Sequence, residues 1–181
     1  MKTPILETKR LILRTLKRED AQEVFLNWTS DSVVAEFMRW NKHEDVTVTE
    51  EWLKTEEQLV ESNEIYNWGI LLKETNELIG SIGLVWIEDK ELYELGYNIM
   101  QKYWNKGFAT EAAQRVVLYG LNELEQVRLY CCHAENNPAS GRVMRKVGFQ
   151  YYGDSVYYSW DQKKKFKAKE YILDRSRIND F

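Results

Sequence analysis

One connection in this chain differs from its neighbours and restricts the fold more than any other feature. Residues 65–72, 78–87 and 92–99 have strand patterns and are separated by short polar turns, so they predict an antiparallel meander. The next strand pattern, at residues 127–134, comes only after an alanine-rich helical stretch at residues 107–124. A helix that joins two neighbouring strands makes those strands parallel. We therefore expect a mixed, mostly antiparallel sheet that contains one parallel pair.

The remaining segments extend this arrangement at both ends. They predict a strand at residues 10–14, helices at residues 17–28, 30–38 and 47–60, a helix at residues 137–147, and a closing hairpin at residues 150–160 and 166–174. Ser30 is the expected cap of the second helix, and Thr47 and Glu50 have capping-box spacing at the start of the third. Gly148 is expected to end the helix before the hairpin. No repeat or flexible linker divides the chain, so residues 1–181 predict one domain.

Composition excludes several classes of protein. Lys and Arg number 25 and Asp and Glu 29, a net charge of −4, which argues against a nucleic-acid partner. Cys131 and Cys132 are adjacent and cannot join distant segments, and with 2 histidines in the chain no metal site is expected. No apolar run reaches about 18 residues, so no membrane span is expected. A reducing cytoplasm is the expected location.

The segment between the third meander strand and the long helix is the first candidate ligand site. It reads Tyr-Trp-Asn-Lys-Gly-Phe-Ala-Thr-Glu-Ala at residues 103–112. A loop that enters a helix exposes free backbone N–H groups, which bind a pyrophosphate readily. Gly107 and Ala109 allow close approach, and Lys106 adds a positive charge. Taken alone, the segment fits an ordinary glycine-containing loop equally well.

A second candidate follows the partner strand of the parallel pair. Pro138 suits the first turn of a helix, and Asn137 and Ser140 can point toward the C-terminal end of the preceding strand. Ligands bind preferentially at that end of parallel strands. The alternative is a capped helix without a ligand.

In combination and spacing, these two segments resemble the GNAT superfamily of acyl-CoA-dependent N-acetyltransferases. The RimJ/RimL-like branch of ribosomal-protein N-terminal acetyltransferases is the most similar, and the likeness extends to residues 8–14 and 94–97. The resemblance implies an α/β GNAT fold in which the central parallel strands splay apart around acetyl-CoA, with helices flanking the sheet. The implied cofactor-binding residues are Tyr97, Asn98, Ile99, Trp104, Asn105, Lys106, Gly107, Phe108, Ala109, Thr110, Asn137, Ser140, Arg142 and Lys146.

The chain departs from the family pattern at three positions. Trp104 and Asn105 stand where the superfamily loop usually has Gln or Arg and then glycine. Asn105 is expected to accept the loop conformation, because asparagine adopts positive φ more easily than most residues. Met144 stands where many members place a catalytic tyrosine, and methionine cannot donate a proton. Ser140 is therefore the expected group at the departing sulfur.

The resemblance implies direct attack of a primary amine on acetyl-CoA within a ternary complex. Glu94 is the candidate base from its place on the strand beside the acetyl site. A purely structural carboxylate is the equal alternative, and Glu36, Glu64 and Glu91 are rivals. Phe37 and Trp40 are expected to line the acceptor cleft, because they precede the loop at which the family forms that cleft.

The acceptor is not specified by these residues. A protein N-terminal α-amino group is the leading expectation. The alternatives are a small-molecule amine such as a polyamine or an aminoglycoside, and a CoA-binding module without catalysis. A homodimer is compatible with this branch, although no segment specifies one.

Overall fold

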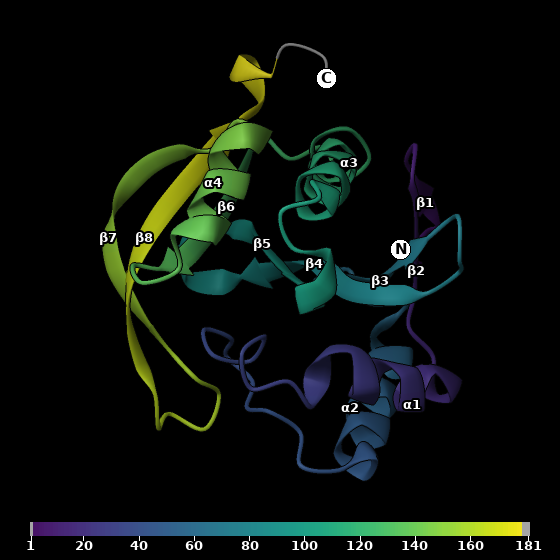
Figure 1. Ribbon diagram of the computed structural model, residues 1–181. Helices are drawn as coiled ribbons and strands as arrows, with labels where there is room; N and C mark the ends of the chain where they lie inside the picture. Colours follow the sequence, from purple (N-terminus) through teal and green to yellow (C-terminus); the bar gives the residue numbers. More distant parts are fainter. Residues whose placement is uncertain (1, 179–181) are drawn as a thin grey trace.

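The computed structural model describes residues 2–178, so residue 1 and residues 179–181 of the expected domain lie outside the described residues. A single eight-stranded sheet runs through the molecule in the order β1-β2-β3-β4-β5-β6-β8-β7 (Figure 1). The strands are β1 (Leu6–Glu7), β2 (Leu11–Arg14), β3 (Ile65–Leu72), β4 (Leu78–Ile87), β5 (Leu92–Ile99), β6 (Arg128–Ala134), β7 (Gln150–Tyr158) and β8 (Lys165–Asp174). The α-helices are α1 (Ala21–Val24), α2 (Val46–Leu59), α3 (Phe108–Asn122) and α4 (Pro138–Val147).

The expected sheet topology is confirmed. Strands β3 to β5 form the antiparallel meander, β2 pairs antiparallel with β3, and β5 and β6, joined through α3, are parallel. The β5–β6 pairing is short, since it joins Tyr93 to Leu129 and Glu94 to Tyr130. Beyond these pairs β6 continues beside β8 while β5 continues beside β4. The sheet therefore opens along one edge of β5, as the resemblance to the GNAT superfamily implied.

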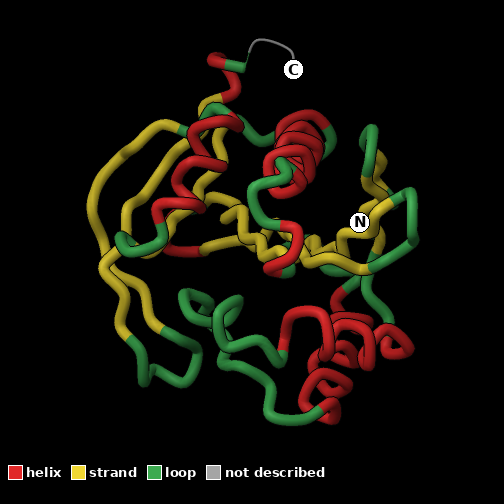
Figure 2. The backbone as a smooth tube through the Cα atoms, viewed as in Figure 1, coloured by secondary structure: helices red, strands yellow, loops and turns green. Residues whose placement is uncertain are grey.

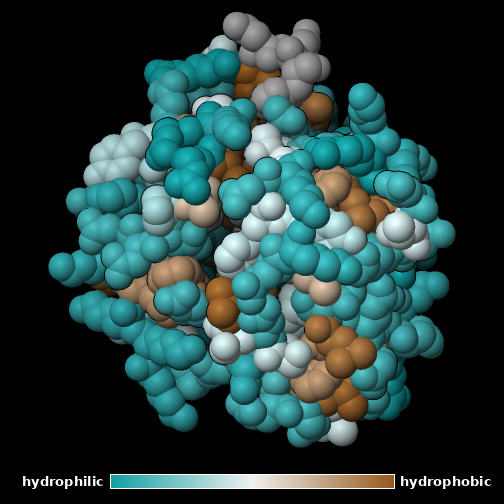
Figure 3. All heavy atoms as spheres, in the orientation of Figure 1, coloured by the Kyte–Doolittle hydropathy of each residue, from teal (hydrophilic) through white to brown (hydrophobic). Residues whose placement is uncertain are grey.

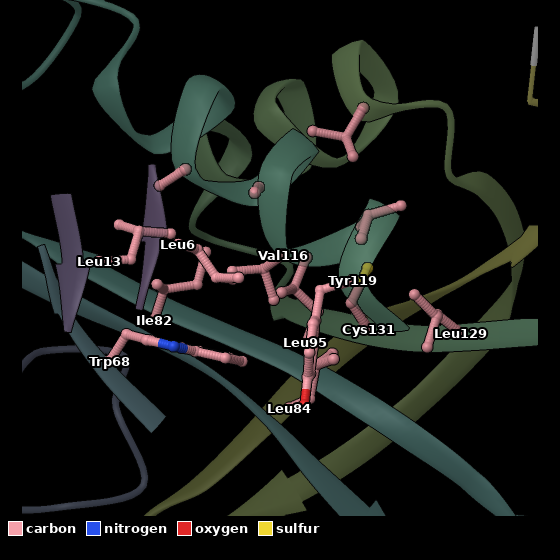
Figure 4. Packing of buried hydrophobic residues seen from close by; sticks show 14 of the residues in the cluster. Leu6, Leu13, Trp68, Ile82, Leu84, Leu95, Val116, Tyr119, Leu129 and Cys131 are labelled. Carbon is pink, nitrogen blue, oxygen red and sulfur yellow. The ribbon is translucent and has the colours of Figure 1, made fainter. Parts of the chain in front are cut away.

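Helices cover both faces of the sheet, as Figures 1 and 2 show, with α3 and α4 on one side and α1 and α2 on the other. The larger hydrophobic cluster lies beneath α3 and α4. Ala112, Ala113, Val116 and Val117 repeat at helical spacing and are fully buried against strand residues such as Leu84 (Figure 4). A second cluster, around Trp28, Leu53 and Leu78, lies beneath α1 and α2. The two clusters hold the central strands in place from both faces.

Most strand and helix bounds agree with the sequence to within two residues, and three of the strands match end to end. The two-residue strand β1 had no sequence signal. The helix expected at residues 17–28 is divided into a 3₁₀ turn, α1, and a π-helical turn at Phe25–Thr29. The side chains of Glu23 and Asn27 bond to the backbone N–H and C=O of Leu78 at 2.8 and 2.6 Å. These tertiary bonds accompany the widened last turn.

The helix expected from Ser30 to Met38 is wrong, because this segment forms a series of turns. Local backbone bonds, such as the one from the Ala35 N–H to the Asp31 carbonyl oxygen at 3.0 Å, form these turns, and the end of the segment bonds to the β7–β8 hairpin. The Tyr157 hydroxyl donates to the Phe37 carbonyl oxygen at 2.6 Å, and the Trp160 N–H donates to the Arg39 carbonyl oxygen at 2.8 Å. Ser30 is no cap, since its hydroxyl donates back to the Phe25 carbonyl oxygen.

The start of α2 also differs from the prediction. Asp45 is the N-cap, and its carboxylate accepts the Thr47 N–H at 2.8 Å, so the expected capping box of Thr47 and Glu50 is wrong. Gly148 does end α4, with a φ of 103°. None of the helices within residues 2–178 is long and apolar enough to cross a membrane. The face shown in Figure 3 is mostly hydrophilic and carries separate hydrophobic patches.

Candidate active site

Two adjoining cavities lie at the opening between β5 and β6. The smaller cavity, about 440 Å³, lies toward the start of α3 and the start of α4. The larger cavity, about 730 Å³, lies over the β3–β4–β5 face and reaches the β7–β8 hairpin. Six residues line both cavities, and we call this set the junction: Phe37, Met38, Tyr97, Asn98, Asn137 and Ser140.

The smaller cavity gathers nearly all of the residues that the sequence predicted for the cofactor. Every one of them lines this cavity except Lys106, whose ammonium lies over the Tyr103 ring. Asn105 and Gly107 have φ values of 59° and 80°, so both adopt the left-handed conformation. Gly107 is the N-cap of α3, and the N–H groups of the first helical turn precede the first intrahelical bonds. This end of the cavity therefore presents free donors and the positive end of the helix dipole.

A clamp from the N-terminal segment holds this loop. The Glu111 carboxylate, in the first turn of α3, accepts bonds from the Thr8 hydroxyl at 2.6 Å and from the Arg10 backbone N–H at 2.8 Å. The Arg10 guanidinium bonds to the same carboxylate at 2.6 Å and to the Lys106 carbonyl oxygen at 3.1 Å. The same guanidinium lies 4.2 Å from the centre of the Phe108 ring. Sequence reasoning missed this role of Thr8 and Arg10, since about 100 residues separate them from Glu111.

The free edge of β5 faces the smaller cavity. Tyr97, Asn98 and Ile99 pair with β4 on one side, and the β5–β6 pairing has already ended on the other. Backbone groups on that edge can bond to an extended ligand in the manner of an added strand. The Ile99 carbonyl oxygen accepts a bond from the Trp104 indole N–H at 2.6 Å. Trp104 therefore ties the end of β5 to the loop before α3.

The larger cavity is rich in aromatic residues and carboxylates. Phe37 and Trp40, the expected acceptor residues, line it together with Trp52, Tyr130, Tyr157, Tyr158 and Trp160. Gly83 and Gly96 lie side by side in register on β4 and β5; the Asn67 side chain covers Gly83, whereas nothing covers Gly96. A Cβ atom added at Gly96 would meet nothing within 4 Å. This part of the cavity floor leaves room for a ligand directly against the sheet.

Two hydroxyl groups meet at the junction. The Tyr97 and Ser140 oxygens lie 2.8 Å apart, and the Tyr97 hydroxyl also lies 3.0 Å from the Ser140 carbonyl oxygen. Asn137 caps α4 by accepting the Ser140 N–H at 3.3 Å. Burial raises the pKa of Tyr97, so its hydroxyl stays protonated at neutral pH. The sequence predicted Ser140 here, but not the tyrosine hydroxyl beside it.

Glu94 lies in the larger cavity beside a cation and a thiol. Its carboxylate oxygens are 3.4 and 3.5 Å from the Arg39 guanidinium, and the Cys132 thiol donates to it at 3.2 Å. Burial and the charge of Glu94 raise the pKa of Cys132 to about 12. The Cys132 thiol is therefore protonated at neutral pH and is poorly suited to act as a nucleophile.

The rival carboxylates lie in different places. Glu64 and Glu91 line neither of the two cavities, and Glu91 occupies a turn with a φ of 52°. Glu36 lines the smaller cavity and is exposed. Met144 is buried and lines the larger cavity. The Arg39 cation beside Glu94 had no signal in the sequence and was not predicted.

A split central sheet with a helix start at the opening defines the class of protein, and comparison with known proteins gives the family. Residues 10–150 match the model of the acetyltransferase (GNAT) domain, so the chain belongs to the GNAT acetyltransferase family. It is 33% identical over 175 residues to the uncharacterized N-acetyltransferase YoaA of Bacillus subtilis, covering 96% of this chain and 98% of that protein. The chain is accordingly an acetyl-CoA-dependent N-acetyltransferase.

Solved structures share the fold. RimL, a ribosomal α-N-protein acetyltransferase solved with coenzyme A, superposes with a TM-score of 0.82 at 14% identity and covers 94% of this chain and 98% of its own. The spermidine N-acetyltransferase of Vibrio cholerae, solved with CoA and spermine, superposes with a TM-score of 0.76 at 19% identity, covering 94% and 98%. At these identities the likeness describes the fold alone.

Proposed function

We propose that this enzyme is RimJ/RimL-like and transfers the acetyl group of acetyl-CoA to the α-amino group of a protein N-terminus. The observation that carries the proposal is the junction, where the smaller cavity meets the larger one between the parted strands. Acetyl-CoA is held in the smaller cavity, and the amine enters through the larger cavity. The two substrates meet beside Asn98, Asn137 and Ser140, which line both cavities. Such an arrangement suits direct transfer in a ternary complex.

The chemistry of the smaller cavity fits acetyl-CoA in each of its parts. The free amides from Asn105 to Thr110 receive the diphosphate at the start of α3. Arg142 and Lys146, on exposed turns of α4, add positive charge at the rim. The free edge of β5 from Tyr97 to Ile99 and the side chain of Asn137 hold the pantetheine arm.

Ser140 and Tyr97 serve the departing sulfur. The nitrogen of the amine forms a bond to the acetyl carbon, the carbon–sulfur bond breaks, and sulfur leaves with the electron pair. Ser140 donates a hydrogen bond to that sulfur, which leaves as a thiolate, and the Tyr97 hydroxyl, 2.8 Å from the serine oxygen, keeps its own proton and orients the serine. A backbone N–H near Ile99 stabilises the oxyanion of the tetrahedral intermediate.

Glu94 receives the proton that the amine loses. Residues 94 and 98 lie roughly 13 Å apart along the strand at about 3.3 Å per residue, so the proton crosses through water. The Arg39 guanidinium lies 3.4 Å from the Glu94 carboxylate, so a positive charge stands beside the proposed proton acceptor. An α-amine has a pKa near 8, whereas a lysine-like amine has one near 10.4. The first kind of acceptor needs less help from a base, which favours a protein N-terminus.

A polyamine is the second candidate, and one observation favours it. The Glu56 carboxylate lies at the edge of the larger cavity and accepts bonds from the neutral Trp52 and Asn67 N–H groups, at 3.0 and 2.8 Å. Burial raises its pKa. The positive end of a polyamine in the larger cavity would relieve this desolvation. The RimL and spermidine acetyltransferase structures share the fold at similar TM-scores, so the acceptor must be tested directly.

The deciding experiment is an acceptor screen. The protein is incubated with acetyl-CoA and, separately, with peptides beginning in Ser, Ala or Met, the same peptides blocked at the N-terminus, spermidine and an aminoglycoside. Release of the CoA thiol and the mass of the product are measured. We expect acetylation of the free peptides and none of the blocked ones. Turnover of spermidine alone would transfer the assignment to polyamines.

A further inference from the structure

One buried oxygen at the junction has no partner. Among residues 2–178, the buried side-chain nitrogen and oxygen atoms without a hydrogen-bond partner are Trp28 Nε1 and Asn98 Oδ1. Trp28 packs in the hydrophobic cluster beneath α1 and α2 and lines neither cavity. Asn98 is 9% exposed and lines both cavities. Buried polar atoms are nearly always bonded, so an unpaired carbonyl oxygen beside a cavity points to a donor that arrives with a ligand.

The other end of this amide bonds across the sheet. Asn98 Nδ2 donates to the Ser81 hydroxyl oxygen at 2.7 Å, and Ser81 lies directly opposite Asn98 in the β4–β5 register. Ser81 lines the larger cavity but not the smaller one. The Asn98 side chain thus faces the acceptor side of the sheet, while its backbone belongs to the edge that faces acetyl-CoA.

A continuous path leads to this oxygen. Glu94, Gly96 and Asn98 share one face of β5, because strand residues alternate. Gly96, between the other two, leaves open space where a side chain would stand. A ligand that crosses this bare floor has the Glu94 carboxylate at one end and the Asn98 oxygen at the other. That oxygen is therefore the first acceptor that a nitrogen meets on reaching the junction.

We propose that Asn98 Oδ1 binds the acceptor amine by accepting a hydrogen bond from one of its N–H groups. The inference rests on the proposed function and adds a residue that contacts the nucleophile. An amine that attacks the thioester directs its lone pair at the acetyl carbon, and its N–H bonds point elsewhere. Asn98 holds one of these N–H bonds and so aims the lone pair. The amide takes no proton, which leaves through water toward Glu94.

The acceptor class follows from this geometry. The group at the junction must present an N–H donor and fit a space bounded by Asn98, Ser140 and Phe37, each of which lines both cavities. A primary amine meets both needs and keeps an N–H for Asn98 throughout the attack. A thiol or an alcohol, once deprotonated for attack, has no hydrogen left for this oxygen. Asn98 therefore selects amines over oxygen and sulfur nucleophiles.

The test compares two substitutions of similar size. Asn98→Leu removes both polar groups, whereas Asn98→Asp keeps an oxygen that accepts. Asn122→Leu, at the exposed end of α3, is the matched control because it makes the same chemical change outside both cavities. For each variant, calorimetry gives the CoA dissociation constant, and thiol release with a Ser-initiated peptide and with spermidine gives kcat and KM.

We expect Asn98→Leu to lower kcat/KM for the amine by about tenfold while the CoA dissociation constant stays within about twofold of the parent. Asn98→Asp should retain more activity than Asn98→Leu, and Asn122→Leu should match the parent. Weaker CoA binding with an unchanged amine KM would assign the oxygen to pantetheine and overturn the inference. Equal loss in the Asp and Leu variants would also overturn it, since the amide N–H₂ would then be the working group.

A parent enzyme that binds CoA but acetylates no amine would overturn the proposed function itself, whereas an active parent with an equally active Asn98→Leu variant would overturn this inference alone.

Discussion

Ser140 and Tyr97 come from different elements and place two hydroxyl groups at the point where the cavities meet. Met144, where many family members have a tyrosine, is buried and cannot give a proton. The tyrosine hydroxyl reaches the site from β5 instead. Because burial raises the pKa of Tyr97, its hydroxyl keeps its proton at neutral pH and can share it with Ser140 in a hydrogen bond. These two side chains therefore form one donor unit rather than two independent groups.

Ser140→Ala should lower kcat by about 10²–10⁴-fold while CoA affinity changes little, because the donated hydrogen bond matters most in the transition state. Tyr97→Phe should cause a smaller loss, and the double variant should be no worse than Ser140→Ala. Steady-state kinetics and CoA calorimetry measure both quantities. A loss below about threefold in Ser140→Ala would reduce this serine to a capping residue of α4.

Glu94→Gln keeps the size of the side chain but removes the carboxylate. We expect the largest rate deficit at low pH, where the amine is mostly protonated and needs a proton acceptor. Toward high pH the neutral amine becomes abundant, so the deficit should shrink. The pH–rate profiles of the parent and the variant give the comparison. A uniform loss at every pH would mean that Glu94 only positions Arg39 and Cys132.

At the scale of elements, the start of α3 is the part on which we propose that cofactor binding depends. Gly107 has a φ of 80° and caps this helix. Gly107→Asn and Gly107→Asp have nearly the same shape, and both residues tolerate a left-handed backbone. They differ in charge, so Asp should repel the diphosphate while it still caps the helix well.

We therefore expect Gly107→Asp to weaken CoA binding by about tenfold or more relative to Gly107→Asn, with similar thermal stability in both. Calorimetry at low ionic strength measures the difference, which should narrow as salt is added. Equal CoA affinities in the two variants would show that the phosphates lie away from this helix start.

The clamp between the N-terminal segment and α3 gives a pH-dependent prediction. Burial raises the pKa of Glu111, but bonds from Thr8 and Arg10 outweigh it and leave the pKa below the usual 4.5. A carboxyl group whose pKa is lower in the folded protein than in the unfolded chain stabilises the fold above pH 4.5. This stabilisation is lost as the pH falls through the pKa of the folded protein. Glu111→Gln should lower the free energy of unfolding by about 1–2 kcal/mol at pH 7.

The parent should then lose that advantage on acidification, so the two proteins should converge toward pH 3. Thermal unfolding between pH 7 and pH 3 gives the comparison, and CoA affinity at pH 7 should fall in the variant because the loop is no longer held. A stability difference that stays constant across this range would contradict the assigned role of Glu111.

The sequence predicted the elements that bury regular apolar stripes, and it failed where tertiary bonds decide. The strands β3, β4 and β5 have strong periodicity and short turns, so their bounds followed directly. The turns between Ser30 and Met38 carry helical spacing, yet the Phe37 carbonyl oxygen bonds to the hairpin more than 100 residues away. Likewise Asp45, and not Thr47, is the cap of α2. Both residue types cap helices well, so the sequence pattern did not distinguish them.

The candidate site shows the same division. The residues of the loop before α3 and the start of α4 were predictable because contiguous motifs carry them. The Tyr97–Ser140 pair and the Arg10–Glu111 clamp join positions 43 and 101 residues apart, and no local pattern indicates such contacts. The unpaired Asn98 oxygen depends on the register that places Ser81 opposite it.

At the scale of the whole molecule, one topological feature accounts for the site. The β5–β6 pairing ends after Glu94 and Tyr130, so the sheet divides into a β1–β5 part and a β6–β8 part. Helices α3 and α4 cover the opening from one face, and the turns that contain Phe37 reach it from the other. The separation of β5 and β6 therefore creates both cavities and determines where they meet.

A structure of this protein crystallised with CoA tests that account most directly. We predict that the diphosphate lies on the amides between Asn105 and Thr110, that the pantetheine arm follows the free edge of β5, and that the sulfur lies at the junction beside Ser140. The larger cavity should stay open to an amine that approaches over Gly96. CoA bound elsewhere, or bound with its sulfur away from Ser140 and Asn98, would contradict the account.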